Sequence, residues 1–143
     1  MAINFGIIGP GNIADRKLAP AIKATEGAKL WGVTSRSLKR ASGFAERHDA
    51  RGPDPAFEDY EEMLAQPDLD AVLVSTPDKL HAEHGIKAAR AGKHVLMEKP
   101  MVADSASGEE LITECENAGV KLGVAYHLRW HRGHRKLIWK IQD

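Results

Sequence analysis

Five short apolar runs, separated by segments with helical patterns, constrain the fold of this chain more than any other feature. The runs are Ile3–Ile8, Leu30–Thr34, Ala71–Val74, His94–Met97 and Leu122–Tyr126. They show little alternation of apolar and polar residues, which is typical of strands covered on both faces of a parallel sheet. Because strands alternate with helices, we predict right-handed crossovers and an α/β fold with a doubly wound parallel sheet.

The segments between these runs are predicted to be helical. They are Asn12–Lys17, a second piece that begins at Pro20, Leu38–Arg47, Glu58–Ala65, Asp78–Ala91 and a last one that begins near Ser107. Proline would break a helix interior, so Pro20 is expected to start a new helix. Ser107 and Glu110 form a capping-box pattern, and Gly92 and Gly119 are expected to end the last two helices.

The composition is that of an ordinary soluble domain. The chain has 143 residues, 20 basic and 20 acidic side chains, and one cysteine. The balanced charge gives no overall attraction to nucleic acid or to an anionic membrane, and no apolar run approaches the roughly 20 residues of a membrane span. The lone Cys115 cannot form an internal disulfide, which fits a reducing compartment, and we expect a cytoplasmic protein.

A glycine-rich turn follows the first apolar run directly. Residues 9–14 read G-x-G-x-x-A and open a helix, the context in which this pattern binds the pyrophosphate of a dinucleotide. Gly9 permits the tight turn, and Gly11 lets a phosphate approach the backbone. The amides of Asn12 and Ile13 are expected to face the anion. The alternative is a turn of the same shape that holds no ligand.

The end of the second apolar run favours NADP over NAD. An NAD site normally has an acidic residue about 20 positions after the glycines, but residues 27–45 contain none. Ser35 and Arg36 stand there, with Lys39 and Arg40 beyond. A guanidinium and hydroxyls suit a 2′-phosphate, so we predict NADP, with NAD as the second option. Alternatively, Arg36 is a solvated loop cation and the ribose is bound without an acid.

Two further runs end in polar motifs that must lie at the same edge of the sheet. These motifs are Ser75-Thr76-Pro77-Asp78, with His81 close behind, and Glu98-Lys99-Pro100. In order and spacing, the four motifs resemble those of the Gfo/Idh/MocA oxidoreductases over about 125 residues. The resemblance implies that residues 1–125 form a Rossmann domain that binds NAD(P).

The same resemblance implies roles for individual residues. Cofactor contacts are expected from Ser75, Thr76, Pro77, Leu80, His81 and, at the nicotinamide ribose, Glu98. Lys99 would point at the substrate hydroxyl and is the expected catalytic residue. The reaction would move a hydride between nicotinamide and the carbinol or carbonyl of a sugar or polyol. Alternatively, Glu98 and Lys99 form a surface ion pair, or the chain is a non-catalytic nucleotide-binding sensor or interaction module.

Two other groups of side chains are interpreted as structural. His81 and His84 have a spacing that could suit a metal, but no cysteine or carboxylate joins them, so no metal site is predicted. The two histidines are expected at the helix surface or beside the cofactor. Cys115 lies on an apolar helix stripe and is predicted to be a small core residue.

The last 18 residues differ from the rest of the chain. Residues 126–143 hold five basic side chains and one acidic one, which leaves 15 basic and 19 acidic in residues 1–125. Arg129 and Trp130 resemble the family's Arg–aromatic pair, although Arg132 replaces a frequent proline, and the histidine-rich sequence resembles NADP-dependent sugar reductases. We expect this basic crossover segment to begin a truncated second domain. The isolated chain should then bind cofactor but catalyse poorly, with homo-oligomers only at full length.

Overall fold

The computed structural model describes residues 2–142, so Met1 and Asp143 lie outside it. All strands of the described part are parallel and form one sheet in the order β3-β2-β1-β4-β5-β6. The strands are β1 (Ile3–Ile8), β2 (Ala28–Thr34), β3 (Ala56–Phe57), β4 (Ala71–Val74), β5 (His94–Met97) and β6 (Leu122–Val124). The predicted doubly wound parallel sheet is confirmed, with its reversal of strand order between β1 and β4.

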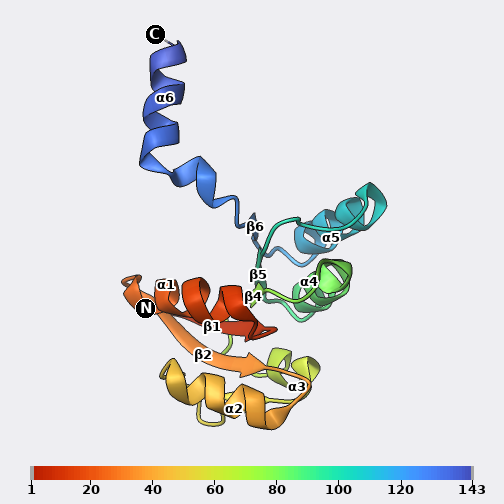
Figure 1. Ribbon diagram of the computed structural model, residues 1–143. Helices are drawn as coiled ribbons and strands as arrows, with labels where there is room; N and C mark the ends of the chain where they lie inside the picture. Colours follow the sequence, from red (N-terminus) through yellow and green to blue (C-terminus); the bar gives the residue numbers. More distant parts are fainter. Residues whose placement is uncertain (1, 143) are drawn as a thin grey trace.

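Helices cover both faces of this sheet (Figure 1). They are the π-helical turn η1 (Ala14–Leu18), α1 (Ala19–Ala24), α2 (Leu38–Arg47), α3 (Tyr60–Leu64), the 3-10 turn η2 (Asp78–Leu80), α4 (His81–Arg90), α5 (Ser105–Asn117), the 3-10 turn η3 (His127–Trp130) and α6 (Arg132–Gln142). One apolar cluster joins β1 and β2 to η1, α1 and α2, and a second joins the sheet to α3, α4 and α5.

The first strand explains why its run is apolar throughout. Ile7 is 0% exposed and packs in the cluster with Phe44 of α2, whereas the next residue, Ile8, is 2% exposed and belongs to the cluster that contains Leu111 of α5. Successive side chains of a strand point to opposite faces, so a strand covered on both sides needs apolar residues at every position. Cys115 is buried in the second cluster, as predicted.

Pro20 lies in the first turn of α1, as predicted, but no break separates this helix from the one before it. Helix runs without interruption from Asn12 to Ala24, and Pro20 is the second residue of α1. The wider turn of η1 comes directly before it, and there the amide of Ala19 donates to the carbonyl of Ala14, five residues back. Proline lacks an N–H and clashes with the carbonyl four residues earlier, so the π-helical turn lets the helix continue past the ring.

The capping box predicted at Ser107 and Glu110 is also wrong. α5 begins at Ser105, and the carboxylate of Asp104 accepts hydrogen bonds from the backbone amide of Ser107 (2.9 Å) and from its hydroxyl (2.8 Å). These hydrogen bonds lower the pKa of Asp104. An aspartate three residues earlier is a charged acceptor at the N-cap, so it takes the capping role from the serine.

Short elements account for most other differences. β3 was not predicted because its two residues at the sheet edge form no recognisable run. The helix expected over Glu58–Ala65 is shortened to α3, because the side chain of Asp59 accepts a hydrogen bond from the backbone in the first turn and sets its start. Gly92 and Gly119 follow the ends of α4 and α5 with φ of +72° and +65°, as predicted.

The basic segment after β6 leads away from the sheet (Figure 1). The segment ends in helix α6, which buries no side chain within the described residues. Its apolar residues Leu137, Ile138, Trp139 and Ile141 are 50–77% exposed. No helix in residues 2–142 is long and apolar enough to cross a membrane.

Candidate functional site

The glycine-rich turn between β1 and η1 has two glycines with different structural requirements. Gly9 has φ of +90°, and a Cβ there would lie 2.7 Å from Cγ2 of Thr76. Gly11 has ordinary φ, and a Cβ there would meet no atom within 4 Å. Gly9 is therefore needed by the protein's own packing, whereas Gly11 keeps the space above the turn open.

The start of the first helix fits an anionic ligand. Asn12 and Ile13 are exposed in its first turn, where backbone amides have no partner within the helix, and Ala14 is completely buried beneath them. These amides and the helix dipole together favour negative charge at this point. The open space over Gly11 lies beside them in the chain, so the turn fits the pyrophosphate of a dinucleotide.

The loop after β4 is fixed to this turn. The amide of Ser75 donates to the carbonyl of Ile8 (2.9 Å), and the Ser75 hydroxyl donates to the carbonyl of Gly9 (2.8 Å). Thr76 follows, with its backbone within 3.1 Å of where a Gly9 Cβ would lie. The turn and the loop are thus held together directly at the reversal of strand order.

A pocket of about 260 Å³ opens beside these two segments. Its lining side chains come from the carboxyl ends of β1, β4, β5 and β6, and they are Ile13, Ser75, Thr76, Asp78, His81, Glu98, Lys99 and His127. Five predicted cofactor residues and the predicted catalytic lysine are therefore gathered in one place. Pro77 and Leu80 do not line the pocket, whereas Asp78 and His127 line it without having been predicted as site residues.

Glu98 and Lys99 are held at the end of β5. The amide of Glu98 donates to the carbonyl of Val74 (2.9 Å), which continues the pairing of β5 with β4. The Glu98 carboxylate accepts from the backbone amide of Lys99 (3.1 Å), and the Lys99–Pro100 peptide is cis. Within the described residues the two side chains form no ion pair, so the alternative of a surface salt bridge is not what the structure shows.

His81 connects the loop after β4 with the loop after β5. It is 1% exposed, its Nδ1 lies 2.7 Å from the carbonyl oxygen of Pro100, and its Nε2 lies 2.9 Å from that of Thr76. Of the two places expected for this histidine, the helix surface is therefore wrong, and the residue lies at the candidate cofactor pocket instead. A buried ring needs a hydrogen-bond partner, and its one N–H in the neutral form can donate to either loop carbonyl.

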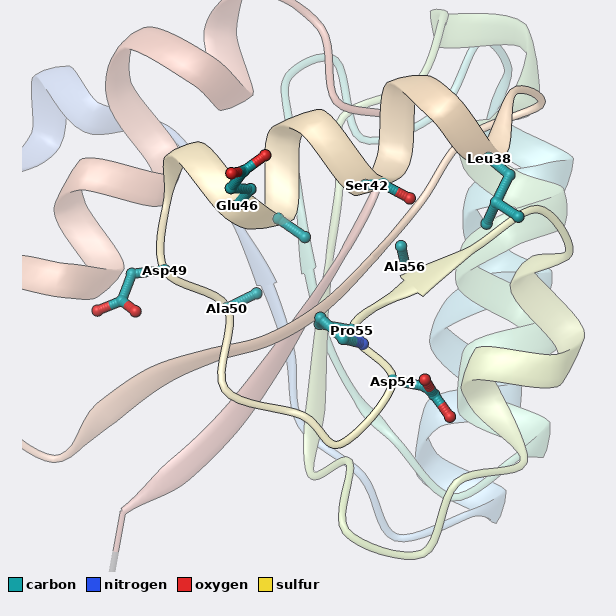
Figure 2. A pocket seen from close by; sticks show the side chains of 9 residues that line it. Leu38, Ser42, Glu46, Asp49, Ala50, Asp54, Pro55 and Ala56 are labelled. Atoms are coloured by element: carbon teal, nitrogen blue, oxygen red, sulfur yellow. The ribbon is translucent and has the colours of Figure 1, made fainter.

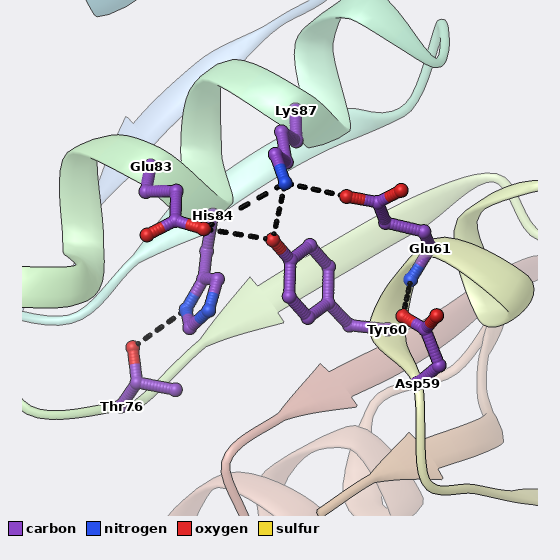
Figure 3. Close-up of polar contacts among 7 residues, drawn as sticks. All are labelled: Asp59, Tyr60, Glu61, Thr76, Glu83, His84 and Lys87. Atoms are coloured by element: carbon purple, nitrogen blue, oxygen red, sulfur yellow. Dashed lines mark hydrogen bonds and ion pairs between the residues drawn. The ribbon is translucent and has the colours of Figure 1, made fainter.

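His84, one turn further along α4, is buried as well and holds the Thr76 side chain (Figure 3). Its Nδ1 lies 3.0 Å from the Thr76 hydroxyl, and its ring meets the ring of Tyr60 edge-on at 4.6 Å. The Tyr60 hydroxyl donates to Glu83 (2.9 Å) and accepts from Lys87 (2.8 Å). Burial is the main cause that raises the pKa of Tyr60. This network supports the loop that lines the pocket.

Burial of His84 predicts a pH-dependent stability. Desolvation lowers the pKa of His84 below its ordinary value of 6.5, so between these two values the unfolded chain binds a proton that the folded chain does not. The contribution to stability is complete above about pH 6.5 and is lost as the pH falls toward the folded-state pKa. Urea unfolding at about pH 7.5 and about pH 5.5 should show a smaller pH dependence for His84→Gln than for the parent chain.

The matched control is His131→Gln, because His131 is exposed. This variant should keep the full pH dependence of the parent. An identical pH dependence in His84→Gln and in the parent chain would show that His84 is not the titrating group.

Of the basic side chains that follow β2, Arg40 is the one shown in contact with the glycine turn. Arg36 is exposed and has no hydrogen-bond or ion-pair partner among residues 2–142. Arg40, one helical turn later, donates from Nη2 to the carbonyl of Pro10 at 3.0 Å. Ser35 is held by its amide, which donates to the carbonyl of Phe57 (3.1 Å). The sequence places Arg40 among the basic residues beyond Arg36, but its contact with the Pro10 carbonyl is visible only in the structure.

A larger depression of about 630 Å³ lies elsewhere, between α2 and the loop that leads into β3 (Figure 2). Its lining includes the acidic residues Glu46, Asp49 and Asp54 and no basic residue. Phosphate groups would be repelled there, so this depression does not compete as a dinucleotide site. Among residues 2–142, no group of three or more potential ligand side chains is arranged to hold a metal ion.

Comparison with known proteins agrees with this geometry. Residues 3–126 match the model of the Gfo/Idh/MocA oxidoreductases, described as an oxidoreductase family with an NAD-binding Rossmann fold. A 1,5-anhydro-D-fructose reductase from Ensifer adhaerens is 38% identical over 93% of this chain and 39% of its own length. A scyllo-inositol 2-dehydrogenase (NADP(+)) from Bacillus subtilis is 41% identical over 84% of this chain and 35% of its own length.

A solved structure is similar over nearly the whole chain. A 3-ketoreductase from Actinomadura kijaniata, in complex with TDP-benzene and NADP, superimposes with a TM-score of 0.93 at 35% identity. The match covers 99% of this chain and 44% of that one, and the chain spans about two fifths of the length of the curated relatives above. The fold, the four motifs and these matches agree, and the chain belongs to the Gfo/Idh/MocA oxidoreductase family through its NAD-binding Rossmann-fold part.

Proposed function

We propose that this chain is the NADP-binding domain of an oxidoreductase that moves a hydride between nicotinamide and the carbinol or carbonyl of a sugar or polyol. The observation that carries the proposal is the convergence of four strand ends on one pocket beside an open, amide-lined glycine turn. The relatives support the substrate class, because they include an anhydrofructose reductase and an inositol dehydrogenase.

Each segment has a distinct task in this proposal. The amides of Asn12 and Ile13 hold the pyrophosphate, and Arg36 and Arg40 hold the 2′-phosphate. The bound cofactor supplies or accepts the hydride. The pocket side chains after β4 and β5 lie on the other side of the strand reversal and face the nicotinamide half.

Lys99 is the proposed catalytic residue. Its side chain is exposed at the pocket, so its ammonium can donate a hydrogen bond to the substrate oxygen and polarise the reacting carbon–oxygen bond. Glu98 fixes the backbone at this point by accepting from the Lys99 amide (3.1 Å). We also propose that residues 126–142 lead into a substrate domain, that the longer protein forms homo-oligomers and that it works in the cytoplasm.

The predicted 2′-phosphate site can be tested with two arginine variants. Arg36→Ala and Arg40→Ala should each weaken NADPH binding by about tenfold or more, because each removes a charge-assisted hydrogen bond worth about 1.5–3 kcal/mol. NADH has no 2′-phosphate, so its binding should not change in Arg36→Ala. Arg40→Ala also removes the hydrogen bond to the Pro10 carbonyl of the turn, so in that variant NADPH binding should weaken more than NADH binding. Isothermal titration calorimetry with both cofactors measures the ratio of the NADPH and NADH dissociation constants in each variant.

Arg51→Ala is the matched control, because Arg51 is exposed and pairs with Asp49. It should bind both cofactors like the parent chain. Equal affinity of the parent chain for NADPH and NADH would contradict the 2′-phosphate assignment, and no binding of either cofactor would contradict the proposed function as a whole.

A further inference from the structure

We propose that His127 binds the nicotinamide half of the cofactor, as a hydrogen-bonding residue supplied by the segment after β6. The inference rests on the proposed function and extends the site beyond the turn, the loop after β4 and the Glu98–Lys99 pair. It also gives the basic crossover segment a part in cofactor binding, which its sequence pattern did not predict.

The pairing of β6 with β5 brings His127 to the pocket. Val124 is in register with Met97, and the amide of Ala125 donates to the carbonyl of Met97 at 2.8 Å. The segments of β5 and β6 therefore stay hydrogen-bonded to each other up to Met97, the residue directly before Glu98. Only two residues later η3 begins, and its first side chain, His127, lines the same pocket as Glu98 and Lys99.

The topology assigns this side of the pocket to the nicotinamide. A dinucleotide lies across the reversal of strand order, with its pyrophosphate at the first helix and its two nucleosides on opposite sides. The arginines that follow β2 occupy one side, which is suited to the 2′-phosphate of the adenosine. His127 follows β6, at the far end of the other side of the β1–β4 reversal.

The histidines of this segment differ in their surroundings. His131 and His134 stack on each other with ring centroids 5.0 Å apart, and Nδ1 of His134 donates to the carbonyl of Leu128 (3.2 Å). Neither lines the pocket. His127 is exposed to the pocket and has no side-chain hydrogen bond within residues 2–142. A neutral imidazole offers one donor and one acceptor, which match a ribose hydroxyl or the carboxamide.

The test compares the whole cofactor with its adenosine half. NADPH and adenosine 2′,5′-bisphosphate are titrated calorimetrically into the 143-residue parent chain, His127→Ala, His127→Gln and the control His131→Ala. His127→Ala should bind NADPH about threefold to tenfold more weakly, the effect of losing one hydrogen bond, and should bind the bisphosphate like the parent. His127→Gln, which keeps a donor and an acceptor, should recover part of the loss.

A second measurement reports on the nicotinamide alone. The fluorescence of bound NADPH comes from the dihydronicotinamide ring, so its change on binding should be altered in His127→Ala and kept in His131→Ala. The inference is overturned if His127→Ala binds NADPH like the parent, or if it weakens NADPH and the bisphosphate equally. If the parent chain binds neither ligand, the proposed function itself has failed.

Discussion

Gly9→Ala should destabilise the fold by about 2–4 kcal/mol and abolish measurable cofactor binding. Two costs add at this position. The φ of +90° is strained for any residue with a side chain, and the new Cβ would lie 2.7 Å from Cγ2 of Thr76 and 3.1 Å from the backbone N and Cα of the same residue. The methyl group can rotate away, but the backbone contacts remain, so the turn and the loop after β4 must separate.

Two other glycines make the experiment specific. Gly11→Ala should leave the free energy of unfolding nearly unchanged, because its Cβ meets no protein atom, and should still weaken NADPH binding by filling the space over the turn. Gly43→Ala, in α2 with open space around its Cβ, should stabilise the chain by about 0.5–1 kcal/mol and leave binding unaffected. Urea unfolding and NADPH titration of the three variants measure both quantities.

Two results would contradict the roles given to Gly9 and Gly11. If Gly11→Ala lost stability as Gly9→Ala does, the space over Gly11 would not be open in the folded chain. If Gly9→Ala bound NADPH as well as the parent chain, the turn would not be the phosphate site.

His81→Leu should cost about 2–4 kcal/mol of folding free energy, the second large effect. The ring has its two nitrogens 2.7 and 2.9 Å from the carbonyl oxygens of Pro100 and Thr76, and it is 1% exposed. A neutral imidazole carries one N–H, so it donates to one of the two carbonyls; leucine fills a similar volume but cannot donate at all, and a buried polar group left without its partner costs about 1–3 kcal/mol. The loop that carries Lys99 and the loop that carries Thr76 would also lose their connection.

The conservative variant His81→Gln provides the comparison. Its amide can still donate to a loop carbonyl, but it does not fill the space of the ring, so urea unfolding should place its stability between those of the parent and His81→Leu. A leucine variant as stable as the parent chain would show that hydrogen bonding by the ring contributes nothing net to folding.

The sequence predicted the sheet well because its central strands are covered on both faces. The runs Ile3–Ile8, Ala71–Val74 and His94–Met97 coincide with β1, β4 and β5 to the residue. The prediction is less accurate where neighbouring side chains decide where a helix starts or whether it continues. Asp104 replaced Ser107 as the cap of α5, and Pro20 was accommodated by a π-helical turn in a preceding segment that carries no sequence signal for one.

The candidate site was predictable to the extent that it follows strand ends. Parallel strands bring their carboxyl ends to one edge, so Ser75, Glu98 and Lys99 meet although the sequence separates them. The burial of His81 depended on where two loop carbonyls lie in space, which no residue pattern encodes. His127 also follows a strand, yet its segment was interpreted through its charge, and its place in the pocket depends on the register of β6 against β5.

The reversal of strand order between β1 and β4 divides the candidate site along the sequence as well as in space. The side chains proposed for the 2′-phosphate lie within residues 34–40, and those proposed for the nicotinamide and the substrate all come after residue 74. We therefore expect that exchanging this short stretch for that of an NAD-using relative changes the preferred cofactor and leaves the reacting end of the site unchanged. In the proposed site, the residues that would select the cofactor and those that would carry the chemistry lie in separate segments of the chain.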